Sequence, residues 1–179
     1  NLPTADSGMI CFNNEGDDKI ARELSWLGIN KDTFNRSNEG SYKWDYTVNE
    51  VGYKYHGNSI MAALGIVGLK YLDEDNQARR DLAARYIENL DGKVKYIKHE
   101  SNQTSRHVFQ VVVEDRDSVI EYLSSNDIYP GVHYRQNNEY KPFQTNQTFI
   151  KSQYYSDRIL SLPLHLELSF EDIDRICNT

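Results

Sequence analysis

A cluster of hydrogen-bond donors occupies residues 52–58 of this 179-residue chain, directly before a run of small residues. The donor side chains are those of Tyr53, Lys54, Tyr55, His56 and Asn58. Gly52 and Gly57 allow tight turns, and Asn58 or Ser59 can cap the helix that follows, whose amino end attracts negative charge. A phosphate is therefore the expected ligand of this loop. A tyrosine-rich loop that only packs and caps a helix would explain the same residues, and the loop alone does not decide between these interpretations.

The composition is that of a folded protein with a real core, because 39% of the residues are hydrophobic and 26% are charged. This length corresponds to one medium domain or one and a half smaller ones. The sequence shows neither a membrane span nor a signal peptide, so we expect a cytoplasmic protein that does not bind membranes. The net charge of -7 argues against nucleic acid as the main partner and leaves a small anion in a local pocket possible.

Cysteines and acidic residues predict no metal site. Cys11 and Cys177 are the only cysteines, which is too few for a disulfide framework and lacks metal-ligand spacing. Asp73, Glu74 and Asp75 are adjacent on a predicted helix, so their carboxylates point in different directions.

The first half of the chain predicts one strand and several helical segments. An apolar strand is expected at 9–12, followed by a turn at 13–18 and a helix that Gly28 ends. Residues 30–49 are a long polar and aromatic stretch, typical of a functional or partner-covered loop. A helical region then runs from residue 58 to residue 90, with a break or new cap at 73–76.

The second half predicts a sheet with helices on one face. Strands are expected at 94–96, 107–113, 128–134 and 159–164, where a turn interrupts the third, and a helix at 115–125. Ser169 caps the last helix, and Asp172 completes a capping box. A buried strand at 9–12 needs neighbours that are absent nearby, so we expect one truncated sheet, one complete sheet and a missing upstream half.

Several motifs in register resemble the carboxy-terminal half of DegT/StrS-type sugar aminotransferases. They lie at 1–10, 52–56, 62–65, 131–134 and 160–164, in the order and approximate spacing of that family, so the resemblance covers the whole chain. It implies an α/β protein of the aspartate aminotransferase-like fold (PLP-transferase type I). It also implies the end of a large cofactor-binding domain with an inter-subunit loop at 1–72, and a connecting helix with a small α+β domain at 73–179.

The resemblance implies a pyridoxal 5'-phosphate (PLP) enzyme that works as a homodimer. Relatives transfer an amino group, commonly from glutamate, to a keto group of a nucleotide-linked deoxysugar, in polysaccharide or glycoside biosynthesis. Their Schiff-base lysine lies immediately before the segment matched by Asn1–Thr4, so we expect that lysine just ahead of Asn1. No lysine of this chain replaces it, and we predict that the chain alone is inactive.

The resemblance also implies roles for the donor loop. Lys54, His56 and Asn58 are expected to bind the cofactor, in a loop that reaches the neighbouring subunit's phosphate. Lys54 stands where relatives often carry asparagine, and an ammonium still suits a phosphate. The alternatives stay open: Lys54 as a solvent-exposed lysine, and Asn58 as a helix cap.

Substrate contacts are expected from Tyr53, His133, Tyr134 and Arg135. His133 and Tyr134 match positions near the hexose of the substrate, and Arg135 is a candidate for the diphosphate. Without the resemblance, this His-Tyr-Arg run is more typical of the end of a strand whose polar groups are satisfied within the chain.

Two further functions remain open at this stage. One is a non-catalytic binding or regulatory module that kept the small domain. The other is a sugar dehydratase of the same family that uses PLP or its amine form, pyridoxamine phosphate (PMP). A lysine directly before Asn1 would favour the aminotransferase, and any other residue would favour these alternatives.

Overall fold

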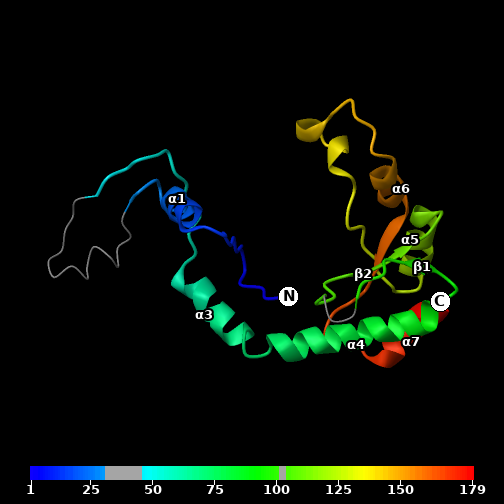
Figure 1. Ribbon diagram of the computed structural model, residues 1–179. Coiled ribbons are helices and arrows are strands. Elements are labelled where there is room, and N and C mark those ends of the chain that lie inside the picture. Colours follow the sequence, from blue (N-terminus) through cyan, green and yellow to red (C-terminus); the bar gives the residue numbers. More distant parts are fainter. Residues whose placement is uncertain (31–45, 101–103) are drawn as a thin grey trace. The chain divides into compact units, whose positions relative to one another are not determined.

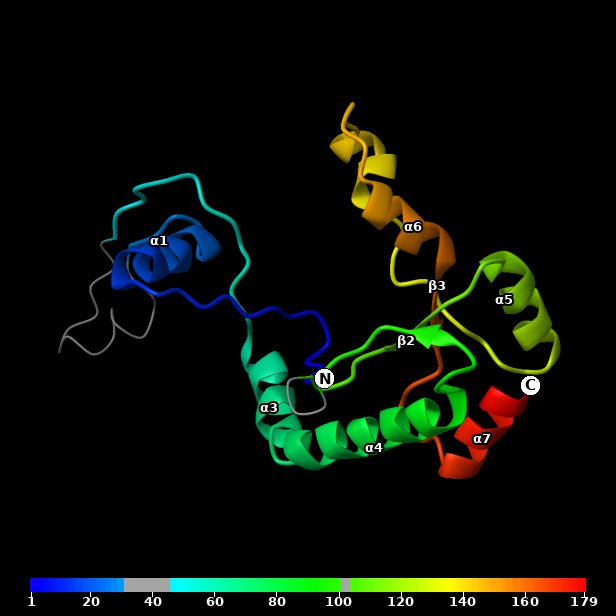
Figure 2. The same cartoon turned by 45° about the vertical axis from the view of Figure 1, so that its right-hand side comes forward.

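The computed structural model describes residues 1–30, 46–100 and 104–179, and the chain forms two compact units (Figures 1 and 2). One unit is Leu2–Lys70. The other is Tyr71–Thr179 together with Asn1. The assignment of residues 1–72 to a large domain and of residues 73–179 to a connecting helix and a small domain remains a prediction. None of the helices in the described ranges is long and apolar enough to cross a membrane.

The unit Leu2–Lys70 contains helices α1 (Glu15–Ser25) and α3 (Ser59–Gly68). Asn14 caps α1, because its side chain accepts a hydrogen bond from the backbone N–H of Asp17 at 2.8 Å. Gly28 takes a positive φ of 73° and its N–H donates to Glu23 O at 2.8 Å. The helix ends at Ser25, three residues before the predicted stop at Gly28, and Leu27 already takes a left-handed φ of 60°; Gly28 contributes the N–H that bonds to the last turn.

The predicted strand at 9–12 is wrong. This segment has no regular secondary structure and pairs with no strand of the described residues, and Met9 is 91% exposed. The physical reason is that a strand is defined by hydrogen bonds to a neighbour, and no described segment of the chain offers them.

The second unit is built on a three-stranded antiparallel sheet in the order β1-β2-β3. Its strands are β1 (Lys95–Tyr96), β2 (Phe109–Val112) and β3 (Ile159–Leu162). In the register, Lys95 pairs with Val112 and Phe109 with Leu162. The predicted strands at 94–96, 107–113 and 159–164 are confirmed, with shorter bounds.

The segment 128–134 differs from its prediction, because it forms one bridge instead of a strand. Gly131 and Ser161 exchange backbone hydrogen bonds of 2.9 and 2.7 Å. Pro130, which precedes Gly131, has no N–H and cannot extend a ladder.

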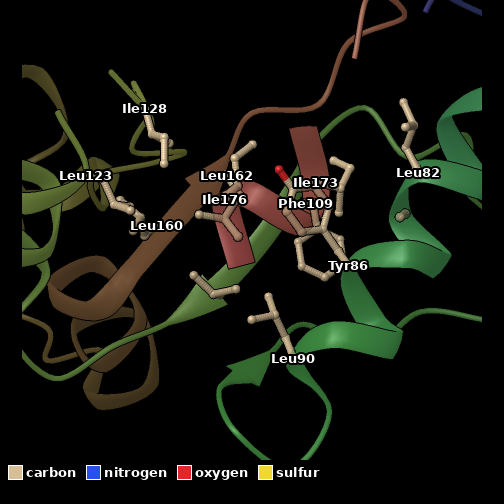
Figure 3. Packing of buried hydrophobic residues seen from close by; sticks show 12 residues of the cluster. Leu82, Tyr86, Leu90, Phe109, Leu123, Ile128, Leu160, Leu162, Ile173 and Ile176 are labelled. Carbon is tan, nitrogen blue, oxygen red and sulfur yellow. The ribbon is translucent and has the colours of Figure 1, made fainter. Parts of the chain in front are cut away.

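Helices α4 (Leu72–Leu90) and α7 (Phe170–Asn178) pack against each other and contribute to the core. The rings of Tyr86 and Phe109 stack at 4.7 Å between centroids, and the Tyr86 hydroxyl donates to Pro163 O at 2.8 Å. Figure 3 shows this cluster with Ile173 beside the two rings. The largest fully buried side chains are those of Tyr86, Phe109, Ile128, Leu160 and Ile173.

A bidentate ion pair joins α4 to α7. Arg85 donates to both carboxylate oxygens of Asp174 at 2.7 Å, and Asn89 adds a third bond of 2.7 Å. The capping box predicted at Ser169 and Asp172 is confirmed, with bonds of 3.1 and 2.9 Å.

The helix break predicted at 73–76 lies earlier, at 69–71. Asp73, Glu74 and Asp75 instead form the first turn of α4, where negative charge stabilises a helix. Helix α5 (Arg116–Ser125), capped by Asp115, agrees with the predicted helix at 115–125.

Helix α6 (Ile150–Arg158) was not predicted from the sequence, because its few apolar residues show no clear helical period. Two short 3-10 turns precede it, η1 (Asn137–Glu139) and η2 (Lys141–Phe143). All three elements lie between the Gly131 bridge and β3.

Candidate functional site

The donor loop at 52–58 is held to the end of α1 by backbone hydrogen bonds. Tyr53 N donates to Leu24 O at 2.6 Å, and Leu27 N donates to Tyr53 O at 3.0 Å. The N–H groups of Tyr55 and His56 both donate to Ser25 O, at 2.9 and 3.2 Å. The loop is therefore positioned by main-chain contacts that do not depend on its side chains.

Two glycines allow this close approach. A Cβ atom at Gly52 would lie 2.1 Å from Gly28 N and 2.6 Å from Leu27 C. A Cβ atom at Gly28 would lie 1.8 Å from Glu50 O. Because these neighbours are backbone atoms, no side chain can move aside to make room.

Trp26 contacts both Lys54 and His56 of the loop. The Lys54 Nζ atom is 4.3 Å from the centroid of the Trp26 ring, and the His56 ring packs edge-on to it at 3.9 Å. The Trp26 Nε1 atom is buried and has no hydrogen-bond partner among the described residues. Lys54 and His56 are both exposed, so their donors remain accessible to an anion. Their cofactor role stays a prediction.

Asn58 caps helix α3. Its side-chain oxygen accepts from Met61 N at 3.0 Å, which confirms the capping alternative; its cofactor role stays a prediction. Tyr53 stacks on Tyr55 with 5.0 Å between ring centroids, and both rings are exposed. The loop thus presents an ammonium, an imidazole and two aromatic faces beside the amino end of α3.

His133, in the other unit, is fixed from two sides. Its Nδ1 atom lies 2.9 Å from Ser161 Oγ on β3, and its carbonyl accepts from Gln110 Nε2 on β2 at 2.7 Å. Gly131 lies directly under the ring, where a Cβ atom would be 2.7 Å from His133 Cε1. This combination leaves the rest of the imidazole as a well-positioned hydrogen-bonding group.

Tyr134 and Arg135 differ in how free they are. Tyr134 is exposed and packs edge-on to His133 at 4.8 Å between centroids. Arg135 donates to Glu139, and bonds from Gln136 and from Arg135 lower the pKa of the Glu139 carboxyl. The alternative in which this run is a strand end with its hydrogen bonds satisfied inside the chain therefore describes Arg135 better than it describes Tyr134. Substrate roles for Tyr53, His133, Tyr134 and Arg135 stay predictions.

A third group, which the sequence analysis did not identify, surrounds Asn1. The Asn1 side-chain amide donates to Asn76 Oδ1 and to Ser105 O, both at 2.8 Å, and Asn1 Oδ1 lies 3.2 Å from His107 Nδ1. The contacts span 75 to 106 residues of sequence, so no local pattern could have predicted them. Trp26, Gln110 and Ser161 escaped notice for the same reason, since each lies within or beside an ordinary helix or strand pattern.

Within the described ranges, no group of three or more His, Cys, Asp or Glu side chains is arranged to hold a metal ion. The polar groups found instead are suited to anions and to hydroxyl groups.

The whole chain matches one protein family. The profile of the DegT/DnrJ/EryC1/StrS aminotransferase family matches residues 1–179. Among solved structures, the chain is similar to Spr1654 of Streptococcus pneumoniae, assigned as a sugar aminotransferase and solved in its PMP form. The TM-score is 0.80 with 27% identity over 93% of this chain and 44% of that chain.

Two further solved structures support the comparison. The sugar aminotransferase CalS13 from Micromonospora echinospora has a TM-score of 0.74 and 25% identity, over 88% of this chain and 42% of that chain. The aminotransferase TlmJ from Streptoalloteichus hindustanus has a TM-score of 0.84 and 23% identity, over 99% of this chain and 47% of that chain. At this identity, the similarity concerns the fold alone. The chain thus spans less than half the length of these relatives.

Spr1654 has been solved in PLP, PMP and apo forms. The cofactor of the family is therefore pyridoxal phosphate. The fold of the chain is the corresponding part of a PLP-dependent aminotransferase.

Proposed function

The chain belongs to the DegT/DnrJ/EryC1/StrS aminotransferase family, and from this premise we propose that the intact protein aminates a nucleotide-linked keto-deoxysugar, with glutamate as the donor. The family match over residues 1–179 is the observation that carries the proposal. The proposed setting is the cytoplasm, in the biosynthesis of a cell-surface polysaccharide or a glycoside.

The catalytic lysine is proposed to stand immediately before Asn1. Such a lysine carries protons between the amino donor and the cofactor. Asn1 is held by Asn76, Ser105 and His107, so the residue ahead of it would start from a fixed position. We accordingly propose that the isolated chain cannot transaminate.

The donor loop fits a phosphate in its chemistry. Lys54 and His56 supply an ammonium and an imidazole, and Asn58 orients the amino end of α3. When bound, the cofactor supplies the electron sink that amino-group transfer needs. In this proposal, Lys54 and His56 hold the phosphate and Trp26 supports both side chains. Asn58 acts through the helix it caps.

The nucleotide-linked sugar is proposed to contact His133, Tyr134 and Tyr53. His133 offers a positioned ring nitrogen, and the two tyrosines offer exposed aromatic faces and hydroxyl groups that suit a saccharide. Arg135 would reach a diphosphate by exchanging its bond to Glu139 for one to the substrate.

Helix α3 supports a homodimer in which the loop serves the neighbouring subunit. The helix is strongly apolar, yet none of its residues is buried within this chain, and Ile60 is 75% exposed. A helix that is hydrophobic on all sides is normally covered by further protein. The rest of the intact fold and a second copy are the proposed cover.

The test is the absorption spectrum of the intact protein with PLP, before and after addition of glutamate. We expect glutamate to convert the cofactor from its aldehyde form to its amine form, and a keto-sugar nucleotide to reverse the change. A spectrum that does not respond to glutamate would reject the aminotransferase and leave the dehydratase or the regulatory module.

Lys54→Ala tests the phosphate assignment in the same protein. We expect the affinity for PLP to fall about tenfold, equivalent to about 1.4 kcal/mol. Lys70→Ala is the matched control, because Lys70 is also an exposed lysine of this unit and lies at its end. Equal PLP affinities for the two variants would contradict the assignment.

A further inference from the structure

A set of side-chain hydrogen bonds joins Asn1 to the second unit. The amide nitrogen of Asn1 donates to Asn76 Oδ1 on α4 and to Ser105 O, both at 2.8 Å. The amide oxygen of Asn1 lies 3.2 Å from His107 Nδ1. Both hydrogens of the amide therefore have an acceptor, and its oxygen faces a ring nitrogen. We call Asn1, Asn76, Ser105 and His107 the Asn1 clamp.

The hydrogen-bond pattern decides which way the amide points and what His107 does. Ser105 O is a backbone carbonyl without a hydrogen, so the Asn1 atom that faces it at 2.8 Å is the nitrogen. This leaves the amide oxygen, which can only accept, facing His107. The Nδ1 atom of His107 consequently carries a hydrogen and donates it to Asn1.

The clamp acts at Asn1 itself. By its contacts Asn1 belongs with Tyr71–Thr179, whereas Leu2–Lys70 form the other compact unit. Two members of the clamp, Ser105 and His107, flank a left-handed turn at Arg106, where φ is 49°. Strained backbone of this kind persists only where the surrounding structure enforces it, and it is concentrated at functional sites.

The strand that follows the clamp also holds His133. His107 lies two residues before β2, and Gln110 within β2 donates to His133 O at 2.7 Å. Gln110 pairs in register with Ser161 of β3, whose Oγ lies 2.9 Å from His133 Nδ1. Asn1 and His133 are thus both tied to the same pair of hydrogen-bonded strands.

We propose that His107 is a positioning residue for the catalytic lysine. This inference rests on the proposed function, in which that lysine directly precedes Asn1. Successive Cα atoms are about 3.8 Å apart across a planar peptide, so fixing Asn1 restricts where the main chain of the lysine lies. Because β2 and β3 also fix His133, the clamp holds the lysine at a constant place relative to a proposed sugar contact. His107 acts through Asn1 and does not touch the substrate.

A lysine that carries protons depends strongly on its position. Its side chain is long and flexible, and a mobile main chain would add to that freedom. A misplacement of about 1 Å can cost about 100-fold in rate. Loss of the clamp should therefore lower kcat, whereas the KM values depend on residues outside the clamp and should change little.

The first test measures the clamp in the intact protein without cofactor, by backbone hydrogen exchange of the peptide that contains Asn1 and Leu2. His107→Phe keeps a flat ring but removes the donor, so exchange should become about tenfold faster. His107→Asn should exchange like the wild type, because its amide nitrogen is bonded to Cγ just as Nδ1 of histidine is. His99→Phe is the matched control, since it removes an exposed imidazole of the same β1–β2 connection that lies outside the clamp.

The second test measures transamination with saturating PLP, per folded protein. We expect His107→Phe to lower kcat about tenfold or more and to leave the KM values for glutamate and the sugar nucleotide within about twofold. His107→Asn should restore kcat, and His99→Phe should not lower it. A residue that only stabilised the fold would reduce the amount of folded protein without this selective loss of kcat.

Unchanged hydrogen exchange in His107→Phe would show that His107 does not hold Asn1, and would overturn the inference. So would faster exchange combined with a wild-type kcat, because the clamp would then be a structural tether. Both results leave the aminotransferase standing, since the wild type still transaminates. A wild type that does not transaminate would refute the proposed function, and the inference would fall with it even if exchange depends on His107.

Discussion

Replacing Gly52 by alanine perturbs the junction between the donor loop and helix α1 at one atom. The new Cβ would lie 2.1 Å from Gly28 N, 2.6 Å from Leu27 C and 2.9 Å from Gly28 Cα. Because all three contacts are with backbone, the loop or the end of α1 must move. Such overpacking costs about 1–3 kcal/mol.

The movement also endangers the hydrogen bonds that Tyr53 makes with Leu24 and Leu27. A hydrogen bond of this kind contributes about 1 kcal/mol net. We therefore expect Gly52→Ala to destabilise the junction by about 3 kcal/mol in total. If PLP binds only when the loop is attached, its affinity should fall by up to about 100-fold, since 1.4 kcal/mol is a factor of ten.

The assay combines chemical denaturation with PLP titration of the intact protein. Gly57→Ala is the control, because Gly57 lies in the same loop with nothing within 4 Å of an added Cβ. It should leave stability unchanged or raise it by up to about 1 kcal/mol, through the unfolded chain. If Gly52→Ala and Gly57→Ala have equal stability and equal PLP affinity, the reasoning about this junction is refuted.

Three further substitutions test the second unit. Tyr86→Phe removes the bond to Pro163 O and should lower the free energy of unfolding by about 1 kcal/mol, measured by urea denaturation. Ser169→Ala removes the α7 cap and should cost about 1 kcal/mol in the same assay. Bonds from Arg85 lower the pKa of Asp174, so this pair stabilises the fold above about pH 4 and its contribution is lost as the pH falls through the lower folded pKa. In melting curves, Asp174→Asn should flatten the loss of stability in that acidic range, and an unchanged pH profile would contradict the assignment.

Local patterns predicted much of the second unit. The capping box at Ser169 was visible because the residues that cap a helix are three positions apart. The strands at 107–113 and 159–164 were visible because their apolar residues are dense and rich in β-formers. Helix α6 was missed because its sequence carries no clear amphipathic period, and its place depends on what it packs against.

The predicted strand at 9–12 shows the limit of such patterns. Its composition favours a strand, but a strand needs a neighbour to exchange hydrogen bonds, and composition does not supply one. The same limit applies to the candidate site. Lys54, His56 and His133 were found from residue types and from the family resemblance, whereas Trp26 beneath the loop was not.

By itself, the sequence determined the helix caps, the two long core strands and the family, because these depend on residues close together along the chain or on motifs in a fixed order. Only the tertiary structure decided that Gly52 packs against Gly28, that Ser161 holds His133, and that Asn1 meets Ser105 and His107. These contacts join residues from 24 to more than 100 positions apart, which no local periodicity encodes.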